Sequence, residues 1–357
     1  MNKEQKMNAW VLEDLGRICY KEQDMPSLGE REVLVAVKAA GICGSDIPRI
    51  YRTGAYHYPL IPGHEFSGQV VQVQDEKDSS WLNQRVGIFP LIPCKNCMPC
   101  RKKQYEMCRN YSYLGSRRDG GFAELVSVPV QNLLSLPENV TYAQAAMLEP
   151  MAVAVHAVRR LSLSSPSRLD SVVICGLGTI GMLVLMFLLE AGVKNVLVLG
   201  NKEFQEKTVT DLGLSKENYC DIRTRDAAAW IAGRTENMGP QVFFECVGKK
   251  ETVHLGVSCT QPGGEIVLVG NPYSDMELEK NIYWKILRNQ LRIYGTWNSS
   301  FTHSSDDDWH YVLERLEKGR IAPEKLITHR FSAEELEKGL QIMKDKTEDY
   351  CKMIMTI

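Results

Sequence analysis

The chain has 357 residues, 44% hydrophobic and 24% charged, which is the composition of an ordinary folded protein and enough length for two domains. Its 42 basic and 44 acidic residues leave a net charge of -2, so the overall charge favours neither nucleic acid nor an anionic membrane as a partner. The amino end, MNKEQKMNAW, has no apolar signal-peptide core, and no apolar run is long enough to cross a bilayer. We therefore expect a cytoplasmic protein whose 11 cysteines stay reduced.

The first strongly predicted strand, EVLVAVKAA, is followed by two glycine-containing segments, AGICGSDIPRI and PLIPGHEFSG. We expect these segments to be loops that leave adjacent strands, and they contain Cys43, His64 and Glu65. A single cysteine or histidine is more often a packed or surface residue than a metal ligand. Together, these side chains favour an open zinc site, in which protein ligands leave a position for substrate.

Four more cysteines lie in the segment LIPCKNCMPCRKKQYEMC: Cys94, Cys97, Cys100 and Cys108. Three thiols at two-residue spacings and a fourth eight residues later can surround one tetrahedral ion, and thiolates in this number favour zinc or an iron-sulfur cluster. Four protein ligands leave no open position. The spacing therefore predicts a structural zinc site in a lobe of about residues 90–112, which has no strong secondary-structure pattern of its own.

The segment SVVICGLGTIGMLVLMFLLEAG predicts a dinucleotide-binding unit, because an apolar strand leads into three glycines and a continuous apolar helix follows. Gly176 permits a tight turn, Gly178 lets the backbone approach a pyrophosphate, and Gly181 allows close packing of helix on strand. Thr179 and Ile180 stand at the start of that helix, where the phosphates would rest. The later runs NVLVLG, QVFFECVG and GEIVLVG alternate with helical patterns and predict a doubly wound parallel sheet.

The end of the second strand of this sheet carries the signal for cofactor choice. An NAD-binding unit places an acidic residue about twenty residues beyond the glycines, on the ribose 2'-hydroxyl. Gly200 stands there instead, followed by Asn201 and Lys202, which could donate to a 2'-phosphate. The sequence therefore favours NADP over NAD, although Glu203 in a shifted loop would restore NAD binding.

The order and spacing of these motifs are similar to those of the zinc-dependent medium-chain dehydrogenase/reductase superfamily along nearly the whole chain. The resemblance implies an α/β protein. Its GroES-like, mostly-β catalytic domain would comprise residues 1–153 and 293–357, and its Rossmann domain would comprise residues 154–292, with the active-site cleft between them. It also implies two zinc ions per chain, direct hydride transfer between an alcohol and a nicotinamide, and a homo-oligomer, either a dimer or a tetramer.

The resemblance also implies roles for individual residues. Cys43, His64 and Glu149 would hold the catalytic zinc, a glutamate at the third position being typical of the polyol dehydrogenase branch. Glu65 would replace water or move onto the metal during turnover. Ser45 would begin a proton relay and Asp46 would orient His64. Taken alone, Glu149 could instead favour a helix dipole, and Ser45 with Asp46 could form a turn or a helix cap. Two carboxylates would also suit manganese or cobalt.

The stretches GICGSDIPRIYRTGAYHYPLIPGHEFSG and NYSYLGSRRDGGFAE resemble the galactitol-1-phosphate 5-dehydrogenase family, which implies a polyol phosphate or ketose phosphate as the small-molecule partner. Four arginines are candidates for the phosphate group: Arg49, Arg52, Arg117 and Arg118. Each could equally be an ordinary exposed charge. The alternatives are a dehydrogenase for an unphosphorylated polyol, diol or amino alcohol and, more remotely, a non-catalytic binding protein.

Overall fold

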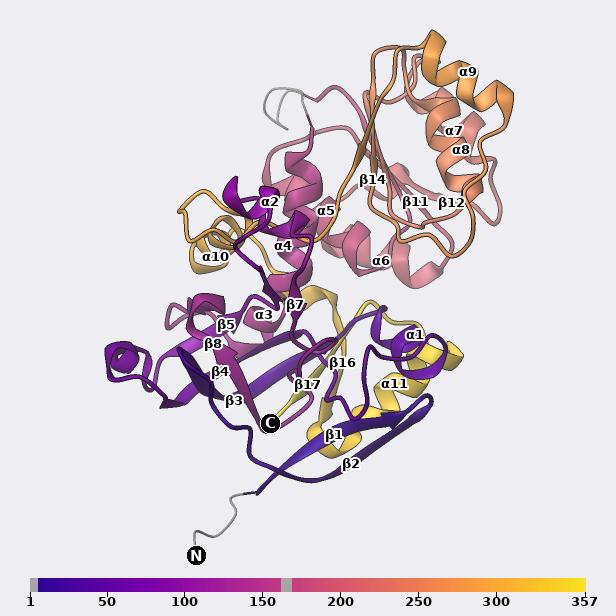
Figure 1. The fold of residues 1–357 in the computed structure, drawn as a ribbon. Coiled ribbons are helices and arrows are strands. Elements are labelled where there is room, and N and C mark those ends of the chain that lie inside the picture. The colour runs from indigo at the N-terminus through magenta and orange to yellow at the C-terminus, as the bar shows by residue number, and fades with distance from the viewer. Residues whose placement is uncertain (1–5, 162–168) are drawn as a thin grey trace, which may run out of the picture. The chain divides into compact units, whose positions relative to one another are not determined.

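The computed structural model describes residues 6–161 and 169–357, and the chain forms two compact units (Figure 1). The first unit comprises Met1–Glu149 and Ser300–Ile357, and the second comprises Pro150–Ser299. Among the helices in the described ranges, none has the length and apolar character needed to span a membrane.

The first unit is built around a seven-stranded sheet with the order β16-β17-β3-β4-β5-β9, in which β8 also pairs with β3. Its strands are β3 (Glu32–Ile42), β4 (Glu65–Val73), β5 (Arg85–Ile88), β8 (Leu125–Pro129), β9 (Leu133–Ser135), β16 (Ile327–Ser332) and β17 (Lys352–Thr356). All neighbouring pairs are antiparallel except β16 and β17, which are parallel. The apolar run of β3 suits its central position, where most of its side chains are buried.

The register of this sheet gathers three chain segments at one end of β3. Gly41 pairs with Glu65 at the start of β4, and Ile42 pairs with Met353 near the start of β17. Cys43 follows β3 directly, so this residue and the first residues of β4 and β17 meet at the same edge. His64 lies in a loop that enters β4, whereas the sequence analysis placed it in a loop leaving a strand.

The remaining elements of the first unit surround this sheet. They are the hairpin of β1 (Lys6–Asp14) and β2 (Arg17–Asp24), the short pair of β6 (Leu91–Ile92) and β7 (Ser112–Tyr113), and the helices α1 (Asp46–Tyr51), α2 (Met98–Arg101), α3 (Tyr142–Ala146), α10 (Asp308–Glu317) and α11 (Leu336–Asp345). Helix α4 (Leu148–Arg159) begins at the end of this unit's first segment. One buried apolar cluster extends from the β1 strand to α11 and β17, so both segments of the chain share a core.

The second unit is a parallel six-stranded sheet with the order β12-β11-β10-β13-β14-β15. Its strands are β10 (Val172–Cys175), β11 (Val196–Gly200), β12 (Tyr219–Asp221), β13 (Val242–Glu245), β14 (Glu265–Leu268) and β15 (Arg292–Gly295). Its helices are α5 (Thr179–Glu190), α6 (Glu203–Asp211), α7 (Ala227–Arg234), α8 (Lys250–Cys259) and α9 (Lys280–Arg288). Figure 1 shows α7, α8 and α9 beside one another, and their buried residues share a core with the strands.

This strand order is the one that dinucleotide-binding sheets adopt, with the order reversing between β10 and β13. Ligands of such sheets bind outside the carboxyl ends of the strands near that reversal. The predicted fold class, a mostly-β part together with a doubly wound parallel sheet, is confirmed.

Candidate functional site

Three potential metal ligands converge at the end of β3. The ligand atoms of Cys43, His64 and Glu65 all lie within 4.8 Å of one another. His64 and Glu65 are buried, and Cys43 is half-buried. Zinc bonds of about 2.0–2.3 Å put neighbouring donor atoms of a tetrahedral site about 3.3–3.8 Å apart. The three donors are therefore gathered at nearly the separation that one zinc ion requires, and their chemistry fits that ion.

Asp46 lies behind the imidazole of His64. Its Oδ1 is 3.5 Å from His64 Nδ1, its Oδ2 accepts a 3.0 Å hydrogen bond from the Cys43 N–H, and Arg49 Nη1 is 2.7 Å from Oδ1. Burial raises the pKa of Asp46, but the charges and hydrogen bonds of His64 and Arg49 outweigh it, so the net pKa is lowered. An ionised carboxylate beside Nδ1 leaves Nε2 as the nitrogen that can bind a metal.

Ser45 stands at the start of α1, where the sequence suggested a possible helix cap. Its side chain makes no capping hydrogen bond, and its exposed hydroxyl instead lies 3.4 Å from the Cys43 sulfur. The hydroxyl is therefore next to a candidate metal ligand and open to solvent. This position is compatible with the proton relay that remains a prediction for Ser45.

Lys352, which the sequence analysis did not identify, forms an ion pair with Glu65. Both side chains are only 2% exposed. The Lys352 ammonium also donates to the carbonyl of Ile42 at 3.1 Å, and a methyl group at Gly41 would lie 2.3 Å from the Glu65 Oε2 atom. Glu65 is therefore held against β3 and β17 by a buried cation, and only a glycine at position 41 leaves room for it.

Glu149, in the first turn of α4, is not one of the three donors that lie within 4.8 Å of one another in the described chain. Its Oε1 accepts a 3.2 Å hydrogen bond from the hydroxyl of Tyr113, whose ring packs at 5.8 Å against that of His64. Burial raises the pKa of Glu149 to about 7, with the charge of His64 opposing this and that of Glu65 adding to it. Glu149 is thus close enough to interact electrostatically with the other candidate ligands, while Tyr113 binds one of its oxygens.

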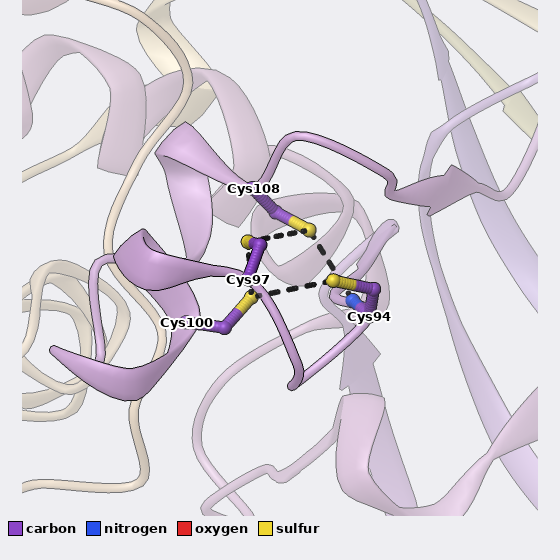
Figure 2. Close-up of side chains that lie close together, drawn as sticks. All are labelled: Cys94, Cys97, Cys100 and Cys108. Atoms are coloured by element: carbon purple, nitrogen blue, oxygen red, sulfur yellow. Dashed lines mark hydrogen bonds between the residues drawn. The ribbon is translucent and has the colours of Figure 1, made fainter.

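The four cysteines of the lobe form a second group of thiols, as Figure 2 shows. The sulfur of Cys97 is 3.4 Å from that of Cys100 and 3.9 Å from that of Cys108, and Cys94 is 4.0 Å from Cys100. Zinc–sulfur bonds of about 2.3 Å in a tetrahedron separate the sulfurs by about 3.8 Å. The donor set and its spacing therefore fit a closed four-thiolate zinc site.

The surroundings of these thiols affect their pKa values in opposite directions. Backbone N–H groups of Arg109 and Cys100 lower the pKa of Cys97 to about 6, whereas burial raises the pKa of Cys100 to about 12. Thiolates packed this closely repel one another unless a cation lies between them. The cluster is thus suited to a divalent ion, which would stabilise all four thiolates at once.

The glycines of the dinucleotide motif occupy the loop between β10 and α5. Gly176 has a φ of 96°, and a Cβ there would lie 2.5 Å from Val247. A Cβ on Gly181 would lie 2.0 Å from the carbonyl oxygen of Gly176, and one on Gly178 would meet no atom within 4 Å. Thr179 and Ile180 form the first turn of α5. The turn thus requires glycine at position 176, and the close packing of α5 requires glycine at position 181. The open space beside Gly178 would let a pyrophosphate approach the backbone.

Gly200 ends β11, and the space beside it is filled. A Cβ at this position would lie 2.6 Å from the Tyr219 ring and 2.7 Å from the Gln205 side-chain oxygen. Gln205 also accepts a 2.9 Å hydrogen bond from the Asn201 N–H and donates one of 3.0 Å to the Leu177 carbonyl. Tyr219 donates to the Lys202 carbonyl at 2.9 Å. A ribose-binding acid therefore has no room at position 200.

A buried carboxylate that the sequence analysis missed organises the neighbouring loop. Glu245, at the end of β13, is 1% exposed, and its Oε1 accepts hydrogen bonds from the Val247 and Gly248 N–H groups at 2.8 and 2.9 Å and from the Thr252 hydroxyl at 2.8 Å. Val247 contacts the Gly176 turn. Glu245 therefore fixes the loop that lies against the predicted phosphate-binding turn.

The four candidate phosphate-binding arginines have different surroundings. Arg49 is paired with Asp46, and Arg118 is paired with Glu32 at 2.7 Å. Arg117 lies between two tyrosine rings, and Arg52 is exposed just after α1. The structure thus gives the described arginines different partners and does not gather their four guanidinium groups around one point of contact.

Comparisons with known proteins agree with this architecture. The family model of the alcohol dehydrogenase GroES-like domain matches residues 29–138, and that of zinc-binding dehydrogenases matches residues 179–318. Galactitol 1-phosphate 5-dehydrogenase of Escherichia coli is 31% identical over 334 residues, covering 92% of this chain and 94% of that protein. L-idonate 5-dehydrogenase of Vitis vinifera is 30% identical over 336 residues, covering 92% of this chain and 88% of that protein.

Solved structures share the same fold over nearly the whole chain. A short chain alcohol dehydrogenase of E. coli complexed with NADH has a TM-score of 0.88 at 27% identity and covers 99% of both chains. A zinc-binding dehydrogenase of Sinorhizobium meliloti bound to NADP has a TM-score of 0.87 at 27% identity, covering 99% of this chain and all (100%) of its own. Relatives with this fold have thus been observed with either nicotinamide cofactor.

Proposed function

The chain belongs to the zinc-binding alcohol dehydrogenases, and on that premise we propose that it interconverts a secondary alcohol of a sugar-alcohol phosphate and the corresponding ketose phosphate by direct hydride transfer. The observation that carries the proposal is the convergence of Cys43, His64 and Glu65 in a chain 31% identical to galactitol 1-phosphate 5-dehydrogenase. The substrate pair we propose is of the galactitol 1-phosphate and tagatose 6-phosphate type.

The side chains around the metal site have separate tasks in this reaction. A bound zinc ion would supply Lewis acidity toward the substrate oxygen. Cys43 and His64 would hold that ion, with Glu149 and Glu65 as further ligands, and Asp46 would fix the ring of His64. The Ser45 hydroxyl, 3.4 Å from the Cys43 sulfur and open to solvent, would take the alcohol proton and pass it outward.

We propose NADP as the preferred cofactor. Tyr219 and Gln205 fill the space in which an acid at position 200 would have to stand, so no carboxylate there can repel a 2'-phosphate. The N–H group of Asn201 is held by Gln205, and Lys202 follows it at the start of α6. The side-chain amide of Asn201 and the ammonium of Lys202 would supply donors and a positive charge to the 2'-phosphate of a bound nucleotide.

A second candidate is the oxidation of an unphosphorylated polyol or sugar acid. It is supported by the 30% identity to L-idonate 5-dehydrogenase over 92% of this chain. Nothing in the donor set of the metal site distinguishes the two substrates, because the reacting alcohol is the same in both. The discrimination has to come from groups that bind the far end of the substrate.

Initial rates of ketose reduction by the zinc-loaded protein test these proposals. Tagatose 6-phosphate and free tagatose would each be offered with NADPH and with NADH. We expect kcat/KM to favour the phosphorylated sugar by about tenfold or more and NADPH over NADH by a similar factor. If neither sugar reacts, the substrate proposal fails while the family assignment stands. Faster reaction with NADH would show that Gly200 and Lys202 do not select NADP.

A further inference from the structure

We propose that Arg117 is the residue that binds the phosphate group of the substrate and so determines specificity for it. The inference rests on the proposed function, because it presupposes a phosphorylated substrate. It assigns to one side chain a task for which the sequence offered four candidates.

Two of the competing arginines already have carboxylate partners. Arg49 lies 2.7 Å from the fully buried Asp46, and Arg118 lies 2.7 Å from Glu32, whose side chain is 11% exposed. Turning either guanidinium toward a phosphate would leave a largely buried carboxylate without its cation, which is costly. Arg49 and Arg118 therefore have structural tasks that oppose a second role in substrate binding.

Arg117 has no carboxylate partner within the described ranges 6–161 and 169–357. Its guanidinium carbon lies 4.5 Å from the ring centre of Tyr56 and 4.1 Å from that of Tyr111. Nη1 donates to the Tyr111 carbonyl at 2.5 Å, and Nη2 donates to the Tyr56 hydroxyl at 3.3 Å. A guanidinium has about five N–H groups, so about three remain for a ligand. The positive charge is therefore held in place without being neutralised.

The two segments that carry this arrangement are fastened to each other. The ring nitrogens of His57 lie 3.0 Å from the Pro59 carbonyl and 3.3 Å from the Arg117 carbonyl. The Ile61 N–H donates to the Asp119 carboxylate at 2.8 Å. Tyr56 and Tyr111 hold the guanidinium of Arg117 in place before any ligand binds, so binding an anion costs little further conformational entropy. A planar fork held in this way suits bidentate binding of phosphate.

A row of aromatic rings leads from Arg117 to the metal site. The rings of Tyr111 and Tyr113 are 6.1 Å apart, and Tyr113 lies 5.8 Å from His64 and donates to Glu149. A polyol phosphate oxidised far from its phosphate needs a metal at one end and a cation at the other. Tyr111 and Tyr113 connect Arg117 to His64 through neighbouring ring contacts, so the candidate cation and the candidate metal site belong to one group of packed side chains.

Arg52 is the remaining competitor. It is exposed, follows the last residue of α1, and makes no side-chain hydrogen bond or ion pair within the described chain. A free and flexible arginine loses side-chain entropy when it binds a ligand, so it recognises an anion less well than one that is already ordered. Its exposure makes it the matched control for Arg117.

The test compares the wild type with Arg117→Gln, Arg117→Lys and Arg52→Gln. For each protein we would measure KM and kcat for tagatose 6-phosphate, the inhibition constant of inorganic phosphate, and the melting temperature as a check on folding. For Arg117→Gln we expect both KM and the inhibition constant to rise about 10- to 100-fold, with a much smaller change in kcat. Arg117→Lys should recover part of the loss, because it keeps the charge and loses the fork.

The outcomes separate this inference from the proposed function. If the wild type reacts with free tagatose as well as with its phosphate, the proposed function fails and the inference fails with it. If the wild type prefers the phosphate but folded Arg117→Gln keeps wild-type KM and phosphate inhibition, only the inference is overturned. A large loss in Arg52→Gln alone would also overturn it and assign the phosphate to Arg52. A loss confined to the Arg117 variants supports it.

Discussion

The buried pair of Glu65 and Lys352 places a carboxylate between two possible cations. Both side chains are 2% exposed, so neither charge is compensated by water. Removing a charge from water costs several kcal/mol, and a good partner offsets that cost. A zinc ion beside Cys43 and His64 would offer Glu65 a second cation. Lys352 thus competes with the metal ion for the carboxylate of Glu65.

Replacing Lys352 by methionine tests this at the level of a single residue. We expect Lys352→Met to lower the free energy of unfolding of the metal-free protein by about 3–5 kcal/mol, because Glu65 is left buried without a cation. The zinc-loaded protein should lose less, since the metal compensates the carboxylate. Urea denaturation with and without a chelator measures both effects.

The double variant Glu65→Gln with Lys352→Met is the control for that experiment. It removes both charges, so it should regain most of the stability that the single variant loses. Stability losses that simply add would show that the two charges do not act as a pair.

At the scale of elements, the four-cysteine lobe has little regular secondary structure. β6 and β7 are two residues long, α2 has four residues, and the apolar side chains of Met98 and Met107 are 59% and 45% exposed. An element with so little buried apolar surface gains its order from a bound ion or from neighbouring structure. The closeness of the four sulfurs favours the ion.

Changing one thiol of the lobe should therefore remove one metal. We expect Cys97→Ser to lower the zinc content from about two ions per chain to about one and to lower the melting temperature. Mass spectrometry of the metal content measures the first effect. Cys19→Ser, at an exposed cysteine outside both donor groups, should leave the content unchanged. An unchanged zinc content in Cys97→Ser would contradict the closed four-thiolate site.

Glu32, the first residue of β3, forms a hydrogen bond with Ser127 of the neighbouring strand β8. Its carboxylate lies 2.7 Å from Arg118 and accepts hydrogen bonds from the Ser127 hydroxyl at 2.6 Å and the Gly29 N–H at 3.0 Å. Burial raises the pKa of Glu32, but these donors outweigh it and the net pKa is lowered. The ionised form therefore stabilises the fold above the pKa that Glu32 has in the unfolded chain.

The lowered pKa of Glu32 predicts how the stability of the fold depends on pH. The contribution of Glu32 should be complete at neutral pH and disappear as the pH falls through the lowered pKa of the folded state. Glu32→Gln should cost about 1 kcal/mol at pH 7, and the difference from wild type should shrink below about pH 4. Urea midpoints measured over this range check the prediction. Glu22→Gln, at an exposed carboxylate without an ion pair in the described chain, should show neither effect. A difference that grows toward acid would contradict the sign.

At the scale of the whole molecule, the sequence predicted the two kinds of sheet, because strand periodicity is a local property. It also singled out the side chains that lie together in both cysteine-containing groups, while Glu149, expected as the third ligand of the catalytic zinc, lies outside the group of Cys43, His64 and Glu65. It could not reveal Lys352 beside Glu65, since that contact depends on the pairing of β17 with β3. The filling of the space beside Gly200 likewise depends on β12 lying next to β11, which brings Tyr219 there. Nor could it separate Arg117 from Arg118, because identical neighbouring residues acquire different partners only in three dimensions.

The discontinuity of the first unit has a consequence for biosynthesis. A ribosome translates Glu65 long before its cation, since Lys352 follows 287 residues later, with the whole second unit in between. During that interval β3 lacks its partner β17, and Glu65 cannot be buried without an opposing charge. Cys43, His64 and Glu65, however, are all present in the nascent chain by then, and a zinc ion captured at that stage would supply the missing charge. Metal availability during translation would then govern the yield of folded protein as well as its later activity.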